Sequence, residues 1–209
     1  TLAIVGSTGA GKSTIVNLLA RFYEPTRGWI EIDGVDIAKV TLESLRREIG
    51  IVPQEGFLFS GTVLENIRVG RPNATDTEVV EAASRIDCLD MINALPDGIH
   101  SLVGERGGQL SLGQRQLVCF ARAMLANPRI LILDEATEGL APLIRAEIWR
   151  VLQELKSQNQ SILVIDKNVD VLTQIADRHY IIEKGIVVWS GDSDSLKNDE
   201  ELQQRYLGV

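Results

Sequence analysis

The chain has 209 residues, of which 44% are hydrophobic and 24% are charged, and its formal net charge is −8. This length and composition allow one sizeable core, which predicts a single domain with a smaller lobe attached. Because the net charge is negative and no run of lysine or arginine occurs, the composition argues against a nucleic-acid partner or a basic membrane-binding face.

The apolar runs are all far shorter than the roughly 20 residues that a helix needs to cross a bilayer. The N-terminus carries no charged-then-apolar leader. Cys88 and Cys119 have neither metal-ligand spacing nor the density of a disulfide framework. We therefore expect a soluble, cytosolic protein with reduced thiols.

The N-terminal segment predicts a strand, a glycine loop and a helix in that order. An apolar run over residues 1–5 stops at Gly6, and from Lys12 apolar residues recur at helical spacing as far as Phe22. The alternating segment 29–34 then predicts a half-buried strand that ends in a hairpin turn.

Residues 49–52 predict a second buried strand, and the pattern then changes to turns and helices, with a helix from Ser111 onward. From residue 130 strands and helices alternate again. Strands are predicted at 130–133, 161–165, 180–183 and 186–189, and helices from Pro142 and over 169–175. This alternation predicts an α/β fold in which helices cover both faces of an open parallel sheet.

Residues 6–13 fit the pattern G-x-x-x-x-G-K-S, in which glycines let backbone N–H groups close around phosphate oxygens at a helix N-terminus. Lys12 would lie on the β and γ phosphates and Ser13 would bind Mg²⁺. The predicted phosphate-binding residues, for ATP, are Gly6, Ser7, Thr8, Gly9, Ala10, Gly11, Lys12, Ser13 and Thr14. A glycine turn without a ligand is the alternative, and the strand and helix on its flanks disfavour it.

The predicted strand over residues 130–133 ends in Asp134 and Glu135. Ligands of open parallel sheets bind at the carboxyl ends of the strands. Asp134 would therefore orient Mg²⁺, and Glu135 would polarise the attacking water. The alternative is a strand that ends in two surface acids.

Residues 110–114, taken alone, predict only a helix that begins after its cap, Ser111. Together with the two preceding motifs they resemble the signature sequence of ABC transporter ATPases, and the resemblance covers the whole chain. It implies a P-loop NTPase fold with a three-layer parallel-sheet core, an inserted α-helical subdomain and a truncated antiparallel β subdomain. We predict one domain over 1–209, with its core at about 1–55 and 122–209 and the helical subdomain at about 56–121.

The resemblance also implies roles and partners. Gln54 matches the glutamine loop of the family, whose side chain senses Mg²⁺ and γ-phosphate, although an exposed polar loop residue is the alternative. In this family two nucleotide-binding domains enclose ATP head to tail, so Ser111, Gly113 and Gln114 would act on the nucleotide of a second copy. In the family, attached membrane domains turn the closing and opening of this dimer into transport. The resemblance therefore implies that the chain is cytoplasmic and lies at the inner face of a membrane.

The two parts of the chain resemble different subfamilies. Residues 1–137 resemble exporters, including residues 103–107, which in exporters touch the intracellular loops of the membrane domain. Residues 138–209, with the tail Tyr206-Leu207-Gly208, resemble the ATPase subunit of branched-chain amino acid importers. We hypothesise a chimera with its boundary near 134–138, with a natural hybrid lineage as the alternative.

Three departures from the family bear on turnover. Lys167 stands where the family has a histidine that contacts γ-phosphate and supports Glu135, and lysine cannot supply the same tautomeric hydrogen bonding. Ala141 replaces an aspartate of the loop that orders communication between the two copies. The aromatic residue that stacks on adenine lies upstream of the glycine loop in the family, and we expect its absence to weaken ATP binding by about one to two orders of magnitude.

Two functions therefore stay open: an ABC-type ATPase with Glu135, Gln54 and Lys167 in its catalytic site, or a folded nucleotide-binding module with little turnover. An ABC-type ATPase acting on DNA or ribosomes is disfavoured, since the chain has no long coiled coil or tandem domain. We expect His100 and His179 to be surface or partly buried polar residues, and Trp29 and Trp189 to pack in edge strands.

Overall fold

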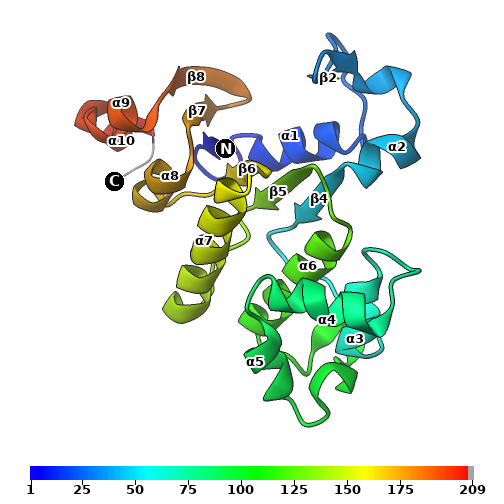
Figure 1. Cartoon of the computed structure of the whole chain (residues 1–209). Helices are drawn as coiled ribbons and strands as arrows, with labels where there is room; N and C mark the ends of the chain where they lie inside the picture. The colour runs from blue at the N-terminus through cyan, green and yellow to red at the C-terminus, as the bar shows by residue number, and fades with distance from the viewer. Residues whose placement is uncertain (207–209) are drawn as a thin grey trace. The chain divides into compact units, whose positions relative to one another are not determined.

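The computed structural model describes residues 1–206 and divides into two compact units (Figure 1). The first unit comprises Thr1–Gly50, Arg129–Glu135 and the chain from Gln160 onward, and the second comprises Ile51–Pro128 and Ala136–Asn159. The predicted division into a core and a helical subdomain stays a prediction. Leu207 and Gly208, which contribute to the importer-like tail, lie outside the described residues.

The first unit is built on a sheet with the strand order β4-β5-β6-β1-β7-β8 among the described residues (Figure 1). The strands are β1 (Leu2–Val5), β4 (Ile49–Val52, which begins in the first unit), β5 (Ile130–Asp134), β6 (Ser161–Ile165), β7 (Arg178–Glu183) and β8 (Ile186–Gly191). β5, β6, β1 and β7 pair in parallel, as predicted.

The sheet is mixed and not wholly parallel, because β8 pairs antiparallel to β7. The two strands are joined by Lys184 and Gly185, whose φ angles of 50° and 80° are both positive. Two-residue hairpin turns of this kind match the right-handed twist of the strands, and glycine adopts a positive φ without strain.

The core of the sheet lies on β5. Leu131, Ile132 and Leu133 are at most 1% exposed. A strand that is buried on both faces reads as a continuous apolar run, which explains why residues 130–133 show no polar alternation. The buried strand ends at the two carboxylates.

The first unit also contains short helices and a small antiparallel sheet. These are α1 (Lys12–Leu19), β2 (Glu31–Ile32), β3 (Val35–Asp36), the 3-10 helix η1 (Ile37–Lys39), α2 (Leu42–Arg47), α8 (Val169–Ile175), α9 (Ser193–Lys197) and α10 (Glu200–Tyr206). The prediction that the first helix reaches Phe22 is wrong. Arg21 has a positive φ of 50°, and Phe22 is exposed and lies 4.8 Å from the Arg46 guanidinium.

In the segment 29–34 only Glu31–Ile32 forms a strand, so the predicted strand begins too early. The predicted hairpin turn is confirmed: Asp33 and Gly34 make it, with φ angles of 51° and 76°. Trp29 lies outside the strand and is 72% exposed, so the prediction that it packs is wrong. A two-residue strand has too little surface to cover an indole ring.

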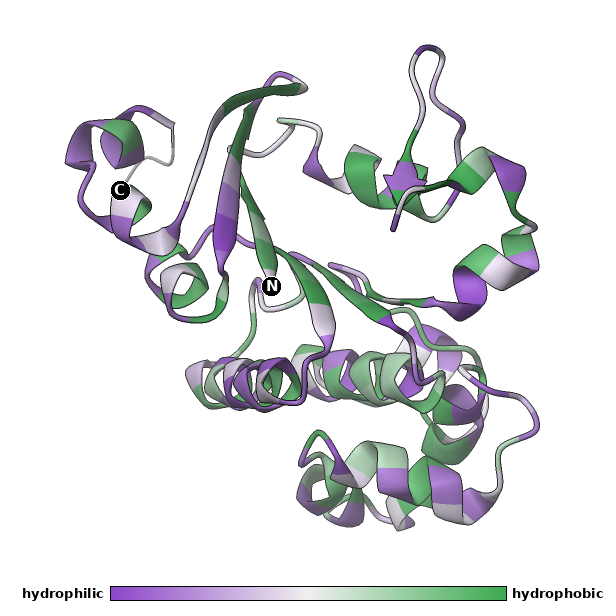
Figure 2. Ribbon diagram, turned by 45° about the horizontal axis from the view of Figure 1, so that its top comes forward, coloured by the Kyte–Doolittle hydropathy of each residue, from purple (hydrophilic) through white to green (hydrophobic). Residues whose placement is uncertain are grey.

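The second unit is helical. Its elements are α3 (Val63–Arg68), α4 (Asp76–Ser84), α5 (Leu89–Asn93), η2 (Gly98–His100), η3 (Glu105–Gly107), α6 (Leu112–Leu125) and α7 (Pro142–Ser157). Thr62, Thr75 and Ser111 each begin a helix with a reciprocal capping box. Polar and apolar colours alternate along these helices (Figure 2), as expected where one face is buried.

Within residues 1–206, no helix has both the length and the apolar composition that a membrane crossing requires.

Cys88 and Cys119 are free and buried. His179 is 0% exposed, so the expectation of a surface or partly buried side chain is wrong for this residue.

Candidate active site

The glycine loop connects β1 to α1, and backbone contacts hold it in place. A Cβ on Gly6 would lie 2.3 Å from the carbonyl oxygen of Ile182, so no other residue fits there without movement of the backbone. Gly11 precedes α1 with a left-handed φ of 102°. The backbone N–H of Gly185 donates to the carbonyl of Ala10 at 2.8 Å, which fixes the loop against the β7–β8 turn.

α1 begins at Lys12, and in the described part of the chain no side chain caps its first turn. The first N–H groups of a helix have no partner within the helix, and the helix dipole adds partial positive charge at this end. The loop therefore presents backbone donors where a phosphate binds in proteins of this type. Ser13 and Thr14 lie in this first turn.

Lys12 is 4% exposed and its ammonium group faces three oxygens. It donates to the carbonyls of Gly6 at 2.9 Å and Ser7 at 3.0 Å, and its Nζ lies 2.9 Å from Oε1 of Glu135. An ammonium group has three N–H donors. A phosphate oxygen that binds Lys12 must therefore replace one of these contacts.

Glu135 follows β5 and lies between two lysines. Besides Lys12, Lys167 places its Nζ 3.9 Å from Oε2 of Glu135, and the Glu135 side chain is 9% exposed. The backbone N–H of Glu135 donates to Ile165 at 2.8 Å, and its φ of 47° is unusual for a residue with a side chain. Such strained backbone is concentrated at functional sites.

Asp134 is the last residue of β5 and accepts a hydrogen bond from the Ser13 hydroxyl at 3.1 Å. Burial raises the pKa of Asp134, and the Ser13 hydrogen bond and the charge of Lys12 oppose this rise. A serine hydroxyl beside a carboxylate provides the oxygen ligands that Mg²⁺ prefers. These side chains fit a magnesium–nucleotide complex, in which the cation would favour the charged form of Asp134.

The remaining predicted site residues lie in the second unit. Ser111 caps α6: its hydroxyl accepts from the Gln114 N–H at 3.2 Å, and Oε1 of Gln114 accepts from the Ser111 N–H at 2.8 Å. Gly113 packs closely on α7, since a Cβ there would lie 3.2 Å from Ile144. Ser111 and Gln114 therefore stabilise the start of α6, and Gly113 allows it to pack closely on Ile144.

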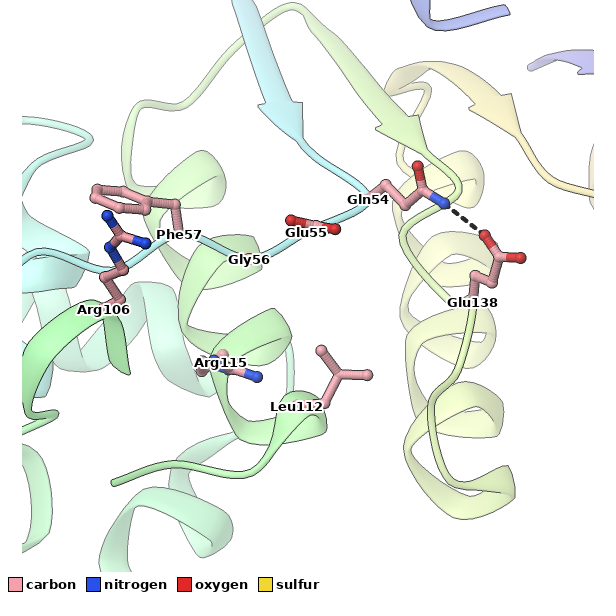
Figure 3. Close-up of a pocket in the computed structure, with 8 residues that line it drawn as sticks. All are labelled: Gln54, Glu55, Gly56, Phe57, Arg106, Leu112, Arg115 and Glu138. Carbon is pink, nitrogen blue, oxygen red and sulfur yellow. Dashed lines mark hydrogen bonds between the residues drawn. The ribbon is translucent and has the colours of Figure 1, made fainter. Parts of the chain in front are cut away.

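Gln54 follows β4, and its Nε2 donates to Oε2 of Glu138 at 2.6 Å. Both side chains line a cavity of about 570 Å³ (Figure 3). The residues that line it are Gln54, Glu55, Gly56, Phe57, Arg106, Leu112, Arg115 and Glu138.

The structure brings five of the predicted site residues together, and their contacts all lie within the first unit. These residues are Lys12, Ser13, Asp134, Glu135 and Lys167. The roles predicted for Gln54 and for the signature residues toward the phosphate site stay predictions. Glu138 was missed as the partner of Gln54. Its signal was the departure of residues 138–141 from the exporter pattern.

A mostly parallel sheet, a phosphate-binding loop with its lysine and a strand that ends in two carboxylates define a P-loop nucleoside triphosphatase. The family model of the ABC transporter matches residues 1–138, which is more than half of the chain. The chain therefore belongs to the ABC transporter family and is an ATP-binding domain of this family.

Relatives of known sequence support this assignment. The chain is 44% identical over 196 residues to an uncharacterised ABC transporter ATP-binding protein of Bacillus subtilis, which covers 94% of this chain and 32% of that protein. It is 47% identical over 196 residues to a putative multidrug export ATP-binding/permease protein of Staphylococcus aureus, covering 94% of this chain and 34% of that protein. The chain thus spans about a third of the length of these relatives.

A solved structure of a bacterial Atm1-family ABC exporter with ATP bound is similar in fold, with a TM-score of 0.90 and 40% identity. The similarity covers 98% of this chain and 36% of the exporter chain. The family model ends at residue 138, close to the boundary suggested for a chimera, but the matches to the relatives cover 94% of this chain and so extend beyond it. The chimera stays a hypothesis.

Proposed function

We propose that the chain hydrolyses ATP with Mg²⁺ and that two copies close around two nucleotides to power export through membrane domains. The observation that carries the proposal is the meeting of two motifs within one unit. Lys12 Nζ lies 2.9 Å from Glu135, and the Ser13 hydroxyl lies 3.1 Å from Asp134. This arrangement puts a phosphate-binding lysine, a metal-type oxygen pair and a candidate general base together.

The site residues of the first unit each have a chemical role in this proposal. The loop N–H groups and Lys12 hold the phosphates, and Ser13 and Asp134 hold Mg²⁺. When bound, Mg²⁺ neutralises charge that develops on the phosphate oxygens. Glu135 orients the attacking water and accepts its proton.

Lys167 supports a second candidate function, a nucleotide-binding module with little turnover. Its ammonium lies 3.9 Å from Oε2 of Glu135, so with Lys12 at 2.9 Å from Oε1 both carboxylate oxygens of Glu135 face a cation and not an attacking water. A lysine also lacks the acceptor nitrogen of a neutral histidine. Ala141, which directly precedes α7, has no polar side-chain group to pair across a dimer.

The second copy is part of the proposal because the chain resembles ABC transporter ATPases, in which the signature residues of one domain act on the nucleotide of the other. Ser111, Gly113 and Gln114 form the start of α6, and a helix start offers backbone donors and positive dipole charge. We propose that this helix start contacts the γ-phosphate held by the second copy.

A membrane domain is the other proposed partner, and the cavity of the second unit supports it. Phe57, Arg106 and Arg115 give this cavity both an aromatic ring and positive charge. Arg106 has a positive φ of 50°, between Gly104 at 74° and Gly107 at 77°, so the chain turns tightly there, and the Arg106 residue itself is exposed. We propose that a loop of the membrane domain docks here, which would place the chain at the inner face of a membrane.

Three forms of the chain test the enzymatic proposal: the parent, Glu135→Gln and Lys12→Ala. We expect steady phosphate release from the parent in Mg-ATP and a loss of about 100-fold or more in Glu135→Gln, because the amide cannot accept the proton. Sedimentation should show that Glu135→Gln forms a dimer in Mg-ATP and that Lys12→Ala does not. Phosphate release from the parent at the Lys12→Ala level, with nucleotide still bound, would establish the binding module instead.

A further inference from the structure

The turn of the β7–β8 hairpin lies beside the glycine loop (residues 6–13) within the first unit (Figure 1). β1 and β7 pair in parallel as far as Val5 and Ile181, so β7 continues past the point where the loop begins. The register between β7 and β8 shifts between Ile181 and Ile182. Such irregularities bend a strand, and they are frequent next to active sites.

The hairpin contacts the loop near both of its ends. At the start of the loop, Gly6 lies so close to the carbonyl of Ile182 that an added Cβ would be 2.3 Å from the oxygen. Near the other end, the N–H of Gly185 donates to the carbonyl of Ala10 at 2.8 Å. Ala10 is 3% exposed, so little water reaches this hydrogen bond. The loop is therefore held at its start and just before α1.

The N–H of Gly185 can reach the loop because the hairpin does not use it. Glu183 pairs with Ile186, and Lys184 and Gly185 form the turn between them with φ angles of 50° and 80°. In such a turn the flanking residues make the hydrogen bonds of the ladder. A Cβ on Gly185 would meet no atom within 4 Å, so glycine is favoured here by its φ and not by a lack of space.

We propose that Gly185 is a positioning residue whose N–H orients the Ala10–Gly11 peptide and so directs the N–H of Gly11 toward the phosphates of the nucleotide. This inference rests on the proposed binding of ATP at the glycine loop. A trans peptide is planar, so its C=O and N–H groups point in opposite directions. Because Gly185 holds the carbonyl of Ala10, the N–H of Gly11 faces away from the hairpin, and it makes no backbone hydrogen bond among the described residues.

Loss of the Gly185 hydrogen bond would leave the Ala10–Gly11 peptide to be ordered by the ligand. The entropy of fixing the backbone of one residue corresponds to a change of about 5- to 30-fold in a binding constant. We therefore expect the affinity for Mg-ATP to fall about tenfold without this hydrogen bond. Coupling of this kind is reciprocal, so bound phosphates should strengthen the hydrogen bond by the same factor.

The β2–β3 hairpin provides a matched control in the same unit. Its turn, Asp33-Gly34, has φ angles of 51° and 76°, and a Cβ on Gly34 would also meet no atom within 4 Å. The N–H of Gly34 makes no backbone hydrogen bond to the glycine loop among the described residues. Proline fixes φ at a negative value and has no N–H, so it strains both turns but releases the loop only at residue 185.

The first test measures amide hydrogen exchange in the ¹⁵N-labelled parent by NMR, corrected for intrinsic exchange rates. Gly185 and Gly34 are both exposed, yet we expect the N–H of Gly185 to exchange about tenfold more slowly, because it is hydrogen-bonded. Mg-ATP should slow exchange at Gly185 about a further tenfold and leave Gly34 unchanged. Equal exchange at the two glycines, or no response of Gly185 to bound Mg-ATP, would overturn the inference.

The second test measures binding of Mg-ATP and of inorganic triphosphate by calorimetry. We expect Gly185→Pro to weaken both about tenfold, since the loss lies at the phosphates, and Gly34→Pro to match the parent. Gly185→Asn should recover most of the loss, because asparagine keeps the N–H and tolerates a positive φ. A purely structural role of Gly185 would instead lower Tm in both proline variants and leave both affinities unchanged.

The inference is overturned if Gly185→Pro binds both ligands like the parent, or if Gly34→Pro loses as much affinity. The exchange measurement uses the parent alone, so it decides the question even where Gly185→Pro does not fold. A parent that binds Mg-ATP no better than Lys12→Ala would refute the proposed function, and this inference with it. Exchange at Gly185 and Gly34 without nucleotide separates these cases, because it reports the hydrogen bond whether or not ATP binds.

Discussion

The ion pair between Lys12 and Glu135 allows a quantitative test of the site without any nucleotide. Lys12→Met keeps the length of the side chain and removes its charge. The side chains of Lys12 and Glu135 are 4% and 9% exposed, and their charged atoms are 2.9 Å apart. The substitution therefore leaves a buried carboxylate without its closest cation.

The expected cost follows from the burial of the pair. Removing one partner of a buried ion pair destabilises proteins by about 3–5 kcal/mol. Lys167, whose side chain is 47% exposed and lies 3.9 Å from Glu135, still offsets part of the remaining charge. We therefore expect about 3 kcal/mol, which for a chain of this size lowers Tm by roughly 6–12 °C.

Thermal unfolding followed by circular dichroism measures this effect. Lys167→Met is the matched control, because the Lys167 side chain is 47% exposed, its ammonium is 3.9 Å from Glu135, and the closer cation Lys12 remains in this variant. We expect its loss to cost at most about 1 kcal/mol and to shift Tm by less than about 4 °C. The double variant Lys12→Met/Glu135→Gln removes both charges and should recover much of the loss. A Tm of Lys12→Met within the control range, or a double variant less stable than Lys12→Met, would refute the reasoning.

Two further predictions concern buried titratable groups. The Ser193 hydroxyl donates its hydrogen to the carbonyl of Ala176 at 2.9 Å, so in the hydrogen bond of 2.8 Å between His179 and Ser193 the donor is Nε2–H of His179. A second proton on the imidazole would therefore enter at Nδ1, which has no hydrogen-bond partner among the described residues. Burial lowers the pKa of His179 in the folded chain, so as pH falls the unfolded chain binds this proton first. The free energy of unfolding should therefore fall as pH drops below about 6.5, and it should fall less in His179→Gln. Burial also raises the pKa of Cys88 to about 12 and raises the pKa of Cys119. A thiol reagent should therefore modify neither cysteine in the folded chain and both cysteines in concentrated urea. Labelling of the folded chain as fast as that of the unfolded chain would contradict this prediction.

The sequence predicted most strands and helices because their signals are local. The apolar run over residues 130–133 has the pattern of a buried strand, and β5 is found there. Pro142 fits the first position of a helix, and α7 begins at Pro142. Periodicity did not set the ends of elements equally well, since α1 stops at Leu19 and the strand predicted over 29–34 keeps two residues.

By itself the sequence predicted the strand, glycine loop and helix of the N-terminal segment and the strand that ends at Asp134, because residue types at fixed spacing carry these local signals. Only the tertiary structure decided which charges meet. Glu135 lies between Lys12 and Lys167, and Gln54 pairs with Glu138, because folding brings distant segments within hydrogen-bond distance. Such contacts depend on side-chain direction and burial, which no local pattern encodes.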